Sequence, residues 1–424
     1  MLTLIAHTTP EPALYGALAA ILAELRAVPL CHLPVSFDAK RFAYGRQYVT
    51  SQGQEIASGL LWLERLTGRD AGSELPLPAL INRAMKEDIV LPVNVDLHST
   101  YCDDIGRLAA EHGIAIERLQ VVKRQGRFQL EDGDSGKVRS NGWTQDSFGR
   151  WILGAWSQPV MRAGKKIRLG LVGDVCEHRD SYPATLAALG DAADALAMNI
   201  EIIYINPSKL GSQLEALLFE VDGILLSGLG DMHSHNTAGQ LTVVHWALET
   251  HTPIMGINQG MHLMVAALGQ QYLGHQRVVM SGPAALNTLQ TSLPVDGGSP
   301  RLGNHRVLTH GGSQLGHILD SEIDWRYNQR WSLNPELADE LASYGLQIGA
   351  SSVDEGAIQA IELSSHPFFI GVQGQPELQS RRERPSHLLM AFLKQLRQSN
   401  QEQEINRATI TKGMRCKHSS FLMG

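Results

Sequence analysis

The heptapeptide GINQGMH, residues 256–262, has the layout of a site that presents one reactive side chain. It follows the apolar residues TPIM and precedes LMVAALGQQ, which predicts a strand, a tight turn and a helix. Glycines two residues before and after Asn258 complete the pattern of a nucleophile elbow. Ser or Cys is usual at such a corner. Asn tolerates the positive φ of the turn, but its amide nitrogen is not a nucleophile.

A second group of candidate residues is the loop DMHSH, which follows a predicted strand at 222–228. In an extended conformation Asp231, His233 and His235 point to one side, and this arrangement suits a transition metal. The other interpretation is a polar loop with exposed imidazoles, and we favour it because no HxxEH-like spacing accompanies the loop. His262, one helical turn after the elbow, is expected near the same pocket.

Hydrophobic periodicity predicts the elements that must position these residues. Apolar strands that alternate with helical patterns are typical of a parallel sheet covered on both faces. The pattern predicts strands at 166–173, 200–206, 222–228, 253–257, 357–363 and 368–373, and helices at 181–198, 238–250 and 386–398. The fold class is therefore α/β, with a parallel or mixed sheet flanked by helices.

The chain divides near residue 160, because residues 126–165 are polar and rich in glycine, as an interdomain region should be. The first 110 residues are also mixed α/β. We predict a smaller Rossmann-like domain over residues 1–160 and a larger domain over residues 161–398. The polar tail, residues 399–424, is expected to be flexible.

Composition argues against several classes of function. The 424 residues carry a net charge of −7, so they offer no basic surface for nucleic acid. The sequence shows neither a signal-peptide pattern nor an apolar run long enough to span a membrane. Its four cysteines lack CxxC pairing, which favours free thiols over a disulfide framework. We predict a cytoplasmic globular protein.

Six segments occur in a fixed order: KIRLGLVGDVCEHRDSYPATLAAL, VDGILLSGLGD, TPIMGINQGMHLMV, RLG at 301–303, AIQAIELSSHPFFIGVQGQPELQSRRERP and HLLMAFLKQL. Together they resemble the class I glutamine amidotransferase domain of the CTP synthase family, over about residues 165–398. YVTSQGQE and LERLTG resemble part of the family's synthetase half. The resemblance thus implies a truncated amidoligase-like domain over residues 1–160, because that half is much longer in the family.

The family hydrolyses glutamine with Cys, His and Glu, and the resemblance places Asn258, Gln375 and Glu377 at these positions. A glutamine side chain has no proton affinity near neutral pH, so Gln375 cannot replace a general base. The resemblance therefore implies an inactive glutaminase site. We expect Asn258 and Gln375 to hydrogen-bond to each other, with Glu377 anchoring the neighbouring strand end.

The resemblance also implies a set of substrate-binding positions. The family's oxyanion loop, PGGFG, corresponds to SGLG, which contains Gly228 and Gly230 and is one glycine short. The glutamine-binding segment RHRHRYEVN corresponds to RYNQRWSLN, which keeps Arg326 and Arg330. Gln259 lies next to the elbow. These residues predict a pocket for a small polar metabolite.

The N-terminal half departs from the family at its ATP site. No GKG or GK[ST] segment accompanies AHTTPEPALYGAL, the place where a phosphate-binding loop is expected. The family's acidic DLD, which would hold Mg²⁺, corresponds to Ala57, Ser58 and Gly59. We therefore expect binding of neither ATP nor Mg²⁺, and a transition metal remains only as the alternative for the DMHSH loop.

Three functions remain open. The first is a non-hydrolysing relative of CTP synthase that binds a small polar metabolite or regulates an active CTP synthase by association. The second is an enzyme whose pocket was rebuilt for another reaction in nucleotide or amino-acid metabolism, with the DMHSH loop supplying acid–base groups or a metal. The third is a structural subunit. A homo-oligomer is compatible with all three, and we prefer the first.

Overall fold

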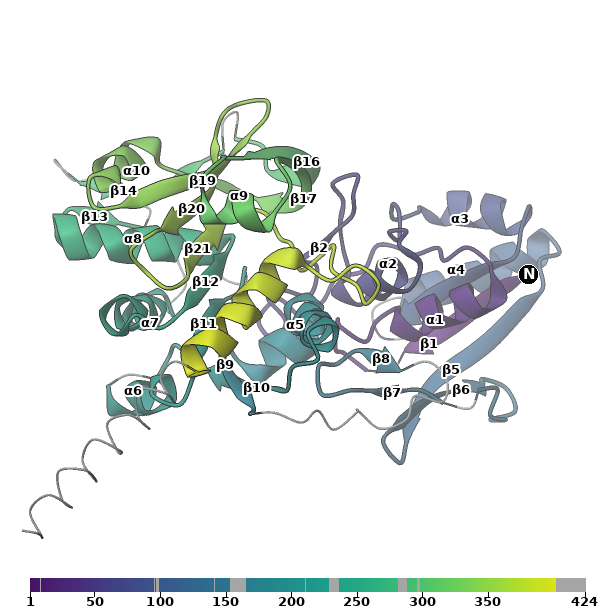
Figure 1. Ribbon diagram of the computed structural model, residues 1–424. Helices are drawn as coiled ribbons and strands as arrows, with labels where there is room; N and C mark the ends of the chain where they lie inside the picture. Colours follow the sequence, from purple (N-terminus) through teal and green to yellow (C-terminus); the bar gives the residue numbers. More distant parts are fainter. Residues whose placement is uncertain are drawn as a thin grey trace, which may run out of the picture.

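The computed structural model describes residues 1–401 except for 8, 95, 97–98, 141, 153–164, 210, 229–235, 281–287 and 296–297, and the side chains of 99–100. Two α/β units, each built around its own sheet, lie side by side (Figure 1). The segment between them, 153–164, lies outside the described residues. Of the tail predicted to be flexible, residues 399–401 continue the last helix instead, and residues 402–424 lie outside the described residues. The domain limits therefore stay a prediction. No helix in the described ranges has both the length and the apolar character needed to cross a bilayer.

The N-terminal unit is a four-stranded sheet with helices on both faces. Its strands, in sheet order, are β4 (Ile89–Asn94), β1 (Leu2–His7), β5 (Ile116–Arg124) and β6 (Arg127–Asp132). Its helices are α1 (Ala17–Arg26), α2 (Leu61–Thr67), α3 (Leu77–Ala84) and α4 (Ser99–Glu111). The first three strands are parallel. Strands β5 and β6 form a hairpin whose turn residues, Gln125 and Gly126, both have positive φ, as a type I′ turn requires.

The C-terminal unit contains a nine-stranded mixed sheet. In sheet order its strands are β10 (Ile200–Ile205), β9 (Ile167–Val172), β11 (Gly223–Leu226), β12 (Ile254–Ile257), β21 (Phe369–Val372), β20 (Ile358–Leu363), β19 (Leu346–Ser352), β16 (Arg301–Thr309) and β17 (Glu322–Gln329). Neighbours from β10 to β21 are parallel, and those from β21 to β17 are antiparallel.

Helices cover both faces of this sheet, as its apolar strands predict. One face carries α6 (Ser212–Leu218), α7 (Thr237–Thr250), α8 (Gln259–Leu273) and α10 (Pro335–Ala342). The other carries α5 (Ala184–Ala195), α9 (Gln314–Ile318) and a helix over 387–401. The remaining short elements are β2 (Tyr48–Val49), β3 (Glu55–Ile56), η1 (Ser58–Leu60), β7 (Thr144–Gln145), β8 (Trp151–Ile152), η2 (Glu177–Ser181), β13 (Val278–Val279), β14 (Leu289–Gln290), β15 (Ser292–Pro294) and β18 (Trp331–Leu333).

The α/β class and the mixed sheet agree with the sequence-based prediction. The sheet is not purely parallel, because its pairs from β21 to β17 are antiparallel. Of these strands, β16, β17 and β19 were not predicted individually. Strand β16 alternates buried and exposed residues, so it contains no continuous apolar run.

The two units share a hydrophobic core. The cluster around α1 and α2 also contains Tyr182, Ala184, Ala187 and Leu378 from the C-terminal unit. These four side chains are at most 1% exposed. The N-terminal unit therefore packs against the same loops and helices that hold the candidate site.

Candidate functional site

Asn258 occupies a strained corner between β12 and α8, as the elbow pattern predicts. Its φ of 51° and ψ of −110° lie where L-residues are rare. The corner is tight because the flanking glycines permit close approach. A Cβ on Gly256 would lie 2.6 Å from the carbonyl carbon of Gly260, and a Cβ on Gly260 would lie 2.7 Å from the oxygen of Leu226.

Both ends of the Asn258 side chain are engaged. Its Oδ1 accepts a hydrogen bond from Gln373 Nε2 at 2.8 Å, and its Nδ2 donates to the carbonyl oxygen of Asn328 at 3.2 Å. Gln373 Oε1 lies 2.8 Å from His262 Nε2, whose Nδ1 lies 2.8 Å from Ser292 Oγ. Ser292, His262, Gln373 and Asn258 thus form one chain of neutral hydrogen bonds.

His262 is fully buried in this chain. Burial lowers the pKa of its imidazole from 6.5 to about 4, although Gln373 partly opposes this shift. The ring is therefore neutral near pH 7, and both of its nitrogens are used. Because the side chain of Gln373 lies between His262 and Asn258, the imidazole does not face the elbow directly.

Gln375 and Glu377 meet at a tyrosine that the sequence did not indicate. Gln375 Nε2 donates to the hydroxyl of Tyr182 at 3.3 Å, and this hydroxyl donates to Glu377 Oε1 at 3.0 Å. All three side chains are at most 2% exposed. Burial raises the pKa of Glu377 to about 7 and that of Tyr182 well above 10. Within the described residues Gln375 Oε1 and Glu377 Oε2 have no hydrogen-bond partner.

The expected bond between Asn258 and Gln375 is replaced by separate partners. Strands β12 and β21 pair Ile257 with Val372, so the next residues, Asn258 and Gln373, lie opposite each other. Gln375 is two residues further along and reaches Tyr182 instead. The two side chains still lie next to the same residue, Gly228. A Cβ added to Gly228 would lie 3.3 Å from Asn258 Cβ and 3.5 Å from Gln375 Nε2. Parallel register was the signal that could have identified Gln373 beforehand.

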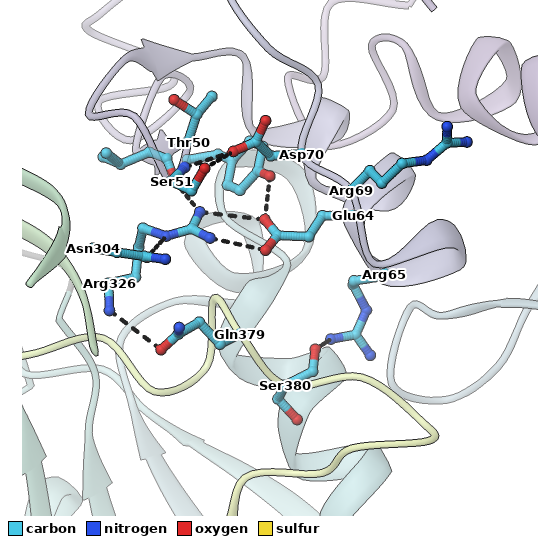
Figure 2. A network of polar contacts seen from close by, with 12 residues as sticks. Thr50, Ser51, Glu64, Arg65, Arg69, Asp70, Asn304, Arg326, Gln379 and Ser380 are labelled. Carbon is cyan, nitrogen blue, oxygen red and sulfur yellow. Dashed lines mark hydrogen bonds and ion pairs between the residues drawn. The ribbon is translucent and has the colours of Figure 1, made fainter. Parts of the chain in front are cut away.

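The side chains of Arg326 and Arg330 extend toward the N-terminal unit (Figure 2 shows Arg326). Arg326, 2% exposed, donates to Glu64 Oε1 at 2.8 Å and Asn304 Oδ1 at 2.6 Å. Arg330 pairs with Glu55 at 2.6 Å. The main chain of Arg326 supports the site, because its carbonyl accepts from Gln375 N at 2.8 Å. Substrate binding by either arginine stays a prediction.

Other predicted residues can be located only in part. Gln259 is buried in the first turn of α8, 3% exposed, next to the elbow. Gly230, Asp231, His233 and His235 lie outside the described residues, so the metal hypothesis is untested there. Elsewhere in the described ranges, no cluster of three His, Cys, Asp or Glu side chains is placed to hold a metal ion.

The position that the resemblance assigns to the family's Mg²⁺ site is filled by the chain itself. Ala57, Ser58 and Gly59 are fully buried, and Ser58 Oγ donates to the oxygen of Tyr44. A Cβ on Gly59 would lie 2.2 Å from the carbonyl oxygen of Tyr15. These residues supply no carboxylate and leave no space around Gly59, so they do not fit Mg²⁺ with ATP.

The sequence profile of the class-I glutamine amidotransferase family matches residues 178–395, which include the elbow and the Tyr182 cluster. The chain therefore belongs to the class-I glutamine amidotransferase family.

Within this family the chain is similar to CTP synthases. It is 31% identical to CTP synthase of Sulfurisphaera tokodaii over 59% of this chain and 48% of that protein. The CTP synthase of Clostridium kluyveri is 29% identical over 74% of this chain and 58% of its own length. The chain spans about half the length of the curated relatives it matches.

A solved structure supports the fold of the C-terminal unit. The glutaminase domain of Trypanosoma brucei CTPS, with bound acivicin, superposes with a TM-score of 0.51 at 21% identity. The superposition covers 55% of this chain and 94% of that domain.

Proposed function

We propose that this protein is a CTP synthase relative that binds a ligand or partner at its amidotransferase site without hydrolysing glutamine. One observation carries the proposal. Asn258 and Gln375, which stand at the family's positions for the nucleophile and the general base, are both carboxamides and both lie next to Gly228. Each amide is already held by a neighbour, Gln373 or Tyr182. Within the described residues Gln375 Oε1 has no partner, so the site keeps an acceptor for a polar group.

The remaining groups do not restore the missing chemistry. The hydroxyl of Tyr182 keeps its proton at neutral pH, because burial raises its pKa well above 10. The imidazole of His262 is neutral, but the Gln373 side chain separates it from Asn258. Glu377 has a pKa near 7. In the family this carboxylate orients a histidine, and here Gln375 stands at the position of that histidine.

Glutamate release from glutamine tests the proposal. We expect no turnover by the natural protein above that of Asn258→Ala. The double substitution Asn258→Cys with Gln375→His should introduce turnover, because it restores the nucleophile and the base beside Glu377. Turnover by the natural protein that disappears in Asn258→Ala would overturn the proposal.

The ligand class and the partner are part of the same proposal. We propose a small polar metabolite at the elbow, or association with the active CTP synthase of the same cell, in the cytoplasm. Native mass spectrometry of the two purified proteins should show a mixed complex if the role is regulatory. Separate species at micromolar concentration would remove the regulatory form. The alternative of a metal-assisted enzyme depends on Asp231, His233 and His235, which lie outside the described residues.

A further inference from the structure

A cavity of about 410 Å³ lies between the two units, and none of its lining residues belongs to the elbow. It is bordered by the segment around α2 and by the loop that follows Glu377. Its lining residues are Ser51, Glu64, Arg65, Gly68, Arg69, Asp70, Asn304, Arg326, Leu378, Gln379, Ser380, Arg381 and Arg384. Five are arginines and two are carboxylates, so the lining carries an excess of positive charge.

The two carboxylates have partners within the protein (Figure 2). Glu64 binds Arg326 at 2.8 Å. Asp70 accepts from the amide and hydroxyl of Ser51, both at 2.6 Å, and from the amide of Gly72 at 3.1 Å. Although burial opposes ionisation, these bonds lower the pKa of Asp70. In the described part of the chain neither acid therefore forms an ion pair with Arg69, Arg381 or Arg384, although the charge of Asp70 still counts in the balance of the lining.

Arg65 and Arg326 are also neutralised. Arg65, whose side chain is 6% exposed, pairs with Asp191 at 2.6 Å and donates to the oxygen of Ser380 at 2.7 Å. The cations that remain are Arg69, Arg381 and Arg384. Arg69 is 80% exposed, and the one described carboxylate that it reaches is Glu24, at 4.0 Å. In the part of the chain that the structure describes, no carboxylate lies within 4.0 Å of Arg381 or Arg384.

The loop holds two of its three arginines opposite each other. Arg381 and Arg384 form an antiparallel bridge, with mutual main-chain hydrogen bonds of 3.2 and 3.0 Å. Directly opposed residues in such a pair project to the same face, and like charges there repel. Gly68 makes room for one of them, since a Cβ at this position would lie 1.9 Å from Arg381 Nη1. An anion between the two guanidinium groups would relieve their repulsion.

We propose that this cavity binds the phosphate group of a small phosphorylated metabolite. With Asp70 subtracted, Arg69, Arg381 and Arg384 leave about two excess positive charges, which match a phosphate monoester near pH 7. Guanidinium groups bind phosphate oxygens in a bidentate manner. The volume exceeds that of phosphate alone and leaves space for the rest of a metabolite. This site is separate from the elbow, so its failure would leave the proposed function untouched.

Calorimetric titration of the full chain tests the proposal, with inorganic phosphate, ribose 5-phosphate and ribose as probes. We expect ribose 5-phosphate to bind and ribose not to bind, with affinity that falls as salt is raised. Inorganic phosphate should bind more weakly than the ester. Binding of inorganic phosphate with exclusion of ribose 5-phosphate would overturn the assignment to a metabolite, and absence of binding by both would overturn the site.

Variants of the loop locate the binding. Arg381→Gln and Arg384→Gln should each weaken ribose 5-phosphate binding by about tenfold, the loss expected for a charge-assisted contact. Arg382→Gln is the matched control, because Arg382 shares the loop and the charge but does not line the cavity. Arg69→Gln, at an exposed side chain, keeps the test valid if a loop variant fails to fold. Equal weakening by Arg382→Gln would contradict a specific site.

Discussion

Asn258 shows how one residue can keep the shape of an elbow while changing its chemistry. The positive φ was predicted from the glycine spacing, because few side chains tolerate such a corner. The partners of its side chain were not predicted, since they depend on the register between β12 and β21. His262 illustrates the same limit: sequence placed it near the pocket, and the structure places it inside the core.

Backbone strain at Asn258 predicts an unusual order of stability. Asn258→Gly and Asn258→Ala lose the same two hydrogen bonds, but only glycine relaxes φ of 51° without a Cβ. We expect the glycine variant to be more stable than the alanine variant by about 1 kcal/mol. Urea denaturation of the two variants measures the difference. Greater stability of the alanine variant would mean that the corner is unstrained.

Burial of Glu377 predicts a pH-dependent effect of its removal. Its folded pKa, about 7, lies above the ordinary value of 4.5, so ionisation costs stability as pH rises from 4.5 through 7. Glu377→Gln has no charge to bury. It should therefore be more stable than the natural protein by about 3 kcal/mol at pH 8, with little difference at pH 4. Melting curves across this range check the sign, and a variant less stable at pH 8 would contradict it.

At the scale of elements, the strand–turn–helix of the elbow could be read from sequence, and so could the parallel strands β9 to β12. Apolar runs and glycine spacing are local signals. The antiparallel extension could not be predicted from the sequence, because β16 alternates in burial and the buried half of β17 contains polar residues, so neither strand has a continuous apolar run. The two strands gain stability from pairing with each other. The direction of the Arg326 side chain was also hidden, since its partner Glu64 is 262 residues away.

Close approach of β11 to α8 predicts a cost for enlarging Gly260. A Cβ at this position would lie 2.7 Å from the oxygen of Leu226, which is backbone and cannot rotate away. Gly260→Ala should lower the free energy of unfolding by about 1–3 kcal/mol. Gly106→Ala is the control, because its nearest contact is the side chain of Arg118 at 3.8 Å within helix α4. That variant should be neutral or stabilised by up to about 1 kcal/mol.

At the scale of the whole molecule, the two units are joined through buried polar contacts as well as a shared core. Glu64 binds Arg326 and Arg65 binds Asp191, while Asn328 Nδ2 donates to Gln47 at 2.9 Å. Asn328 also accepts from Asn258 through its carbonyl. Asn258 and Asn328 therefore connect a ligand at the elbow to Gln47 in the N-terminal unit. We expect such a ligand to stabilise both units.

Loss of Glu64 should destabilise the whole chain. Glu64→Ala leaves the Arg326 guanidinium, 2% exposed, without its carboxylate, and breaking such a buried pair costs about 3–5 kcal/mol. Glu87→Ala removes half of an exposed pair with Arg83, 44% exposed on each side, and should cost less than about 1 kcal/mol. Thermal melts followed by circular dichroism compare the two. Equal costs would show that the units are not held by the buried pair.

Covalent labelling tests the absence of a nucleophile at the elbow most directly. An electrophilic glutamine analogue is incubated with the natural protein and with Asn258→Cys, and the site of any adduct is mapped by mass spectrometry of peptides. Peptide mapping separates the elbow from the exposed thiol of Cys176. We predict an adduct at position 258 only in the cysteine variant. An adduct on the elbow peptide of the natural protein, with ammonia released from glutamine, would contradict the account.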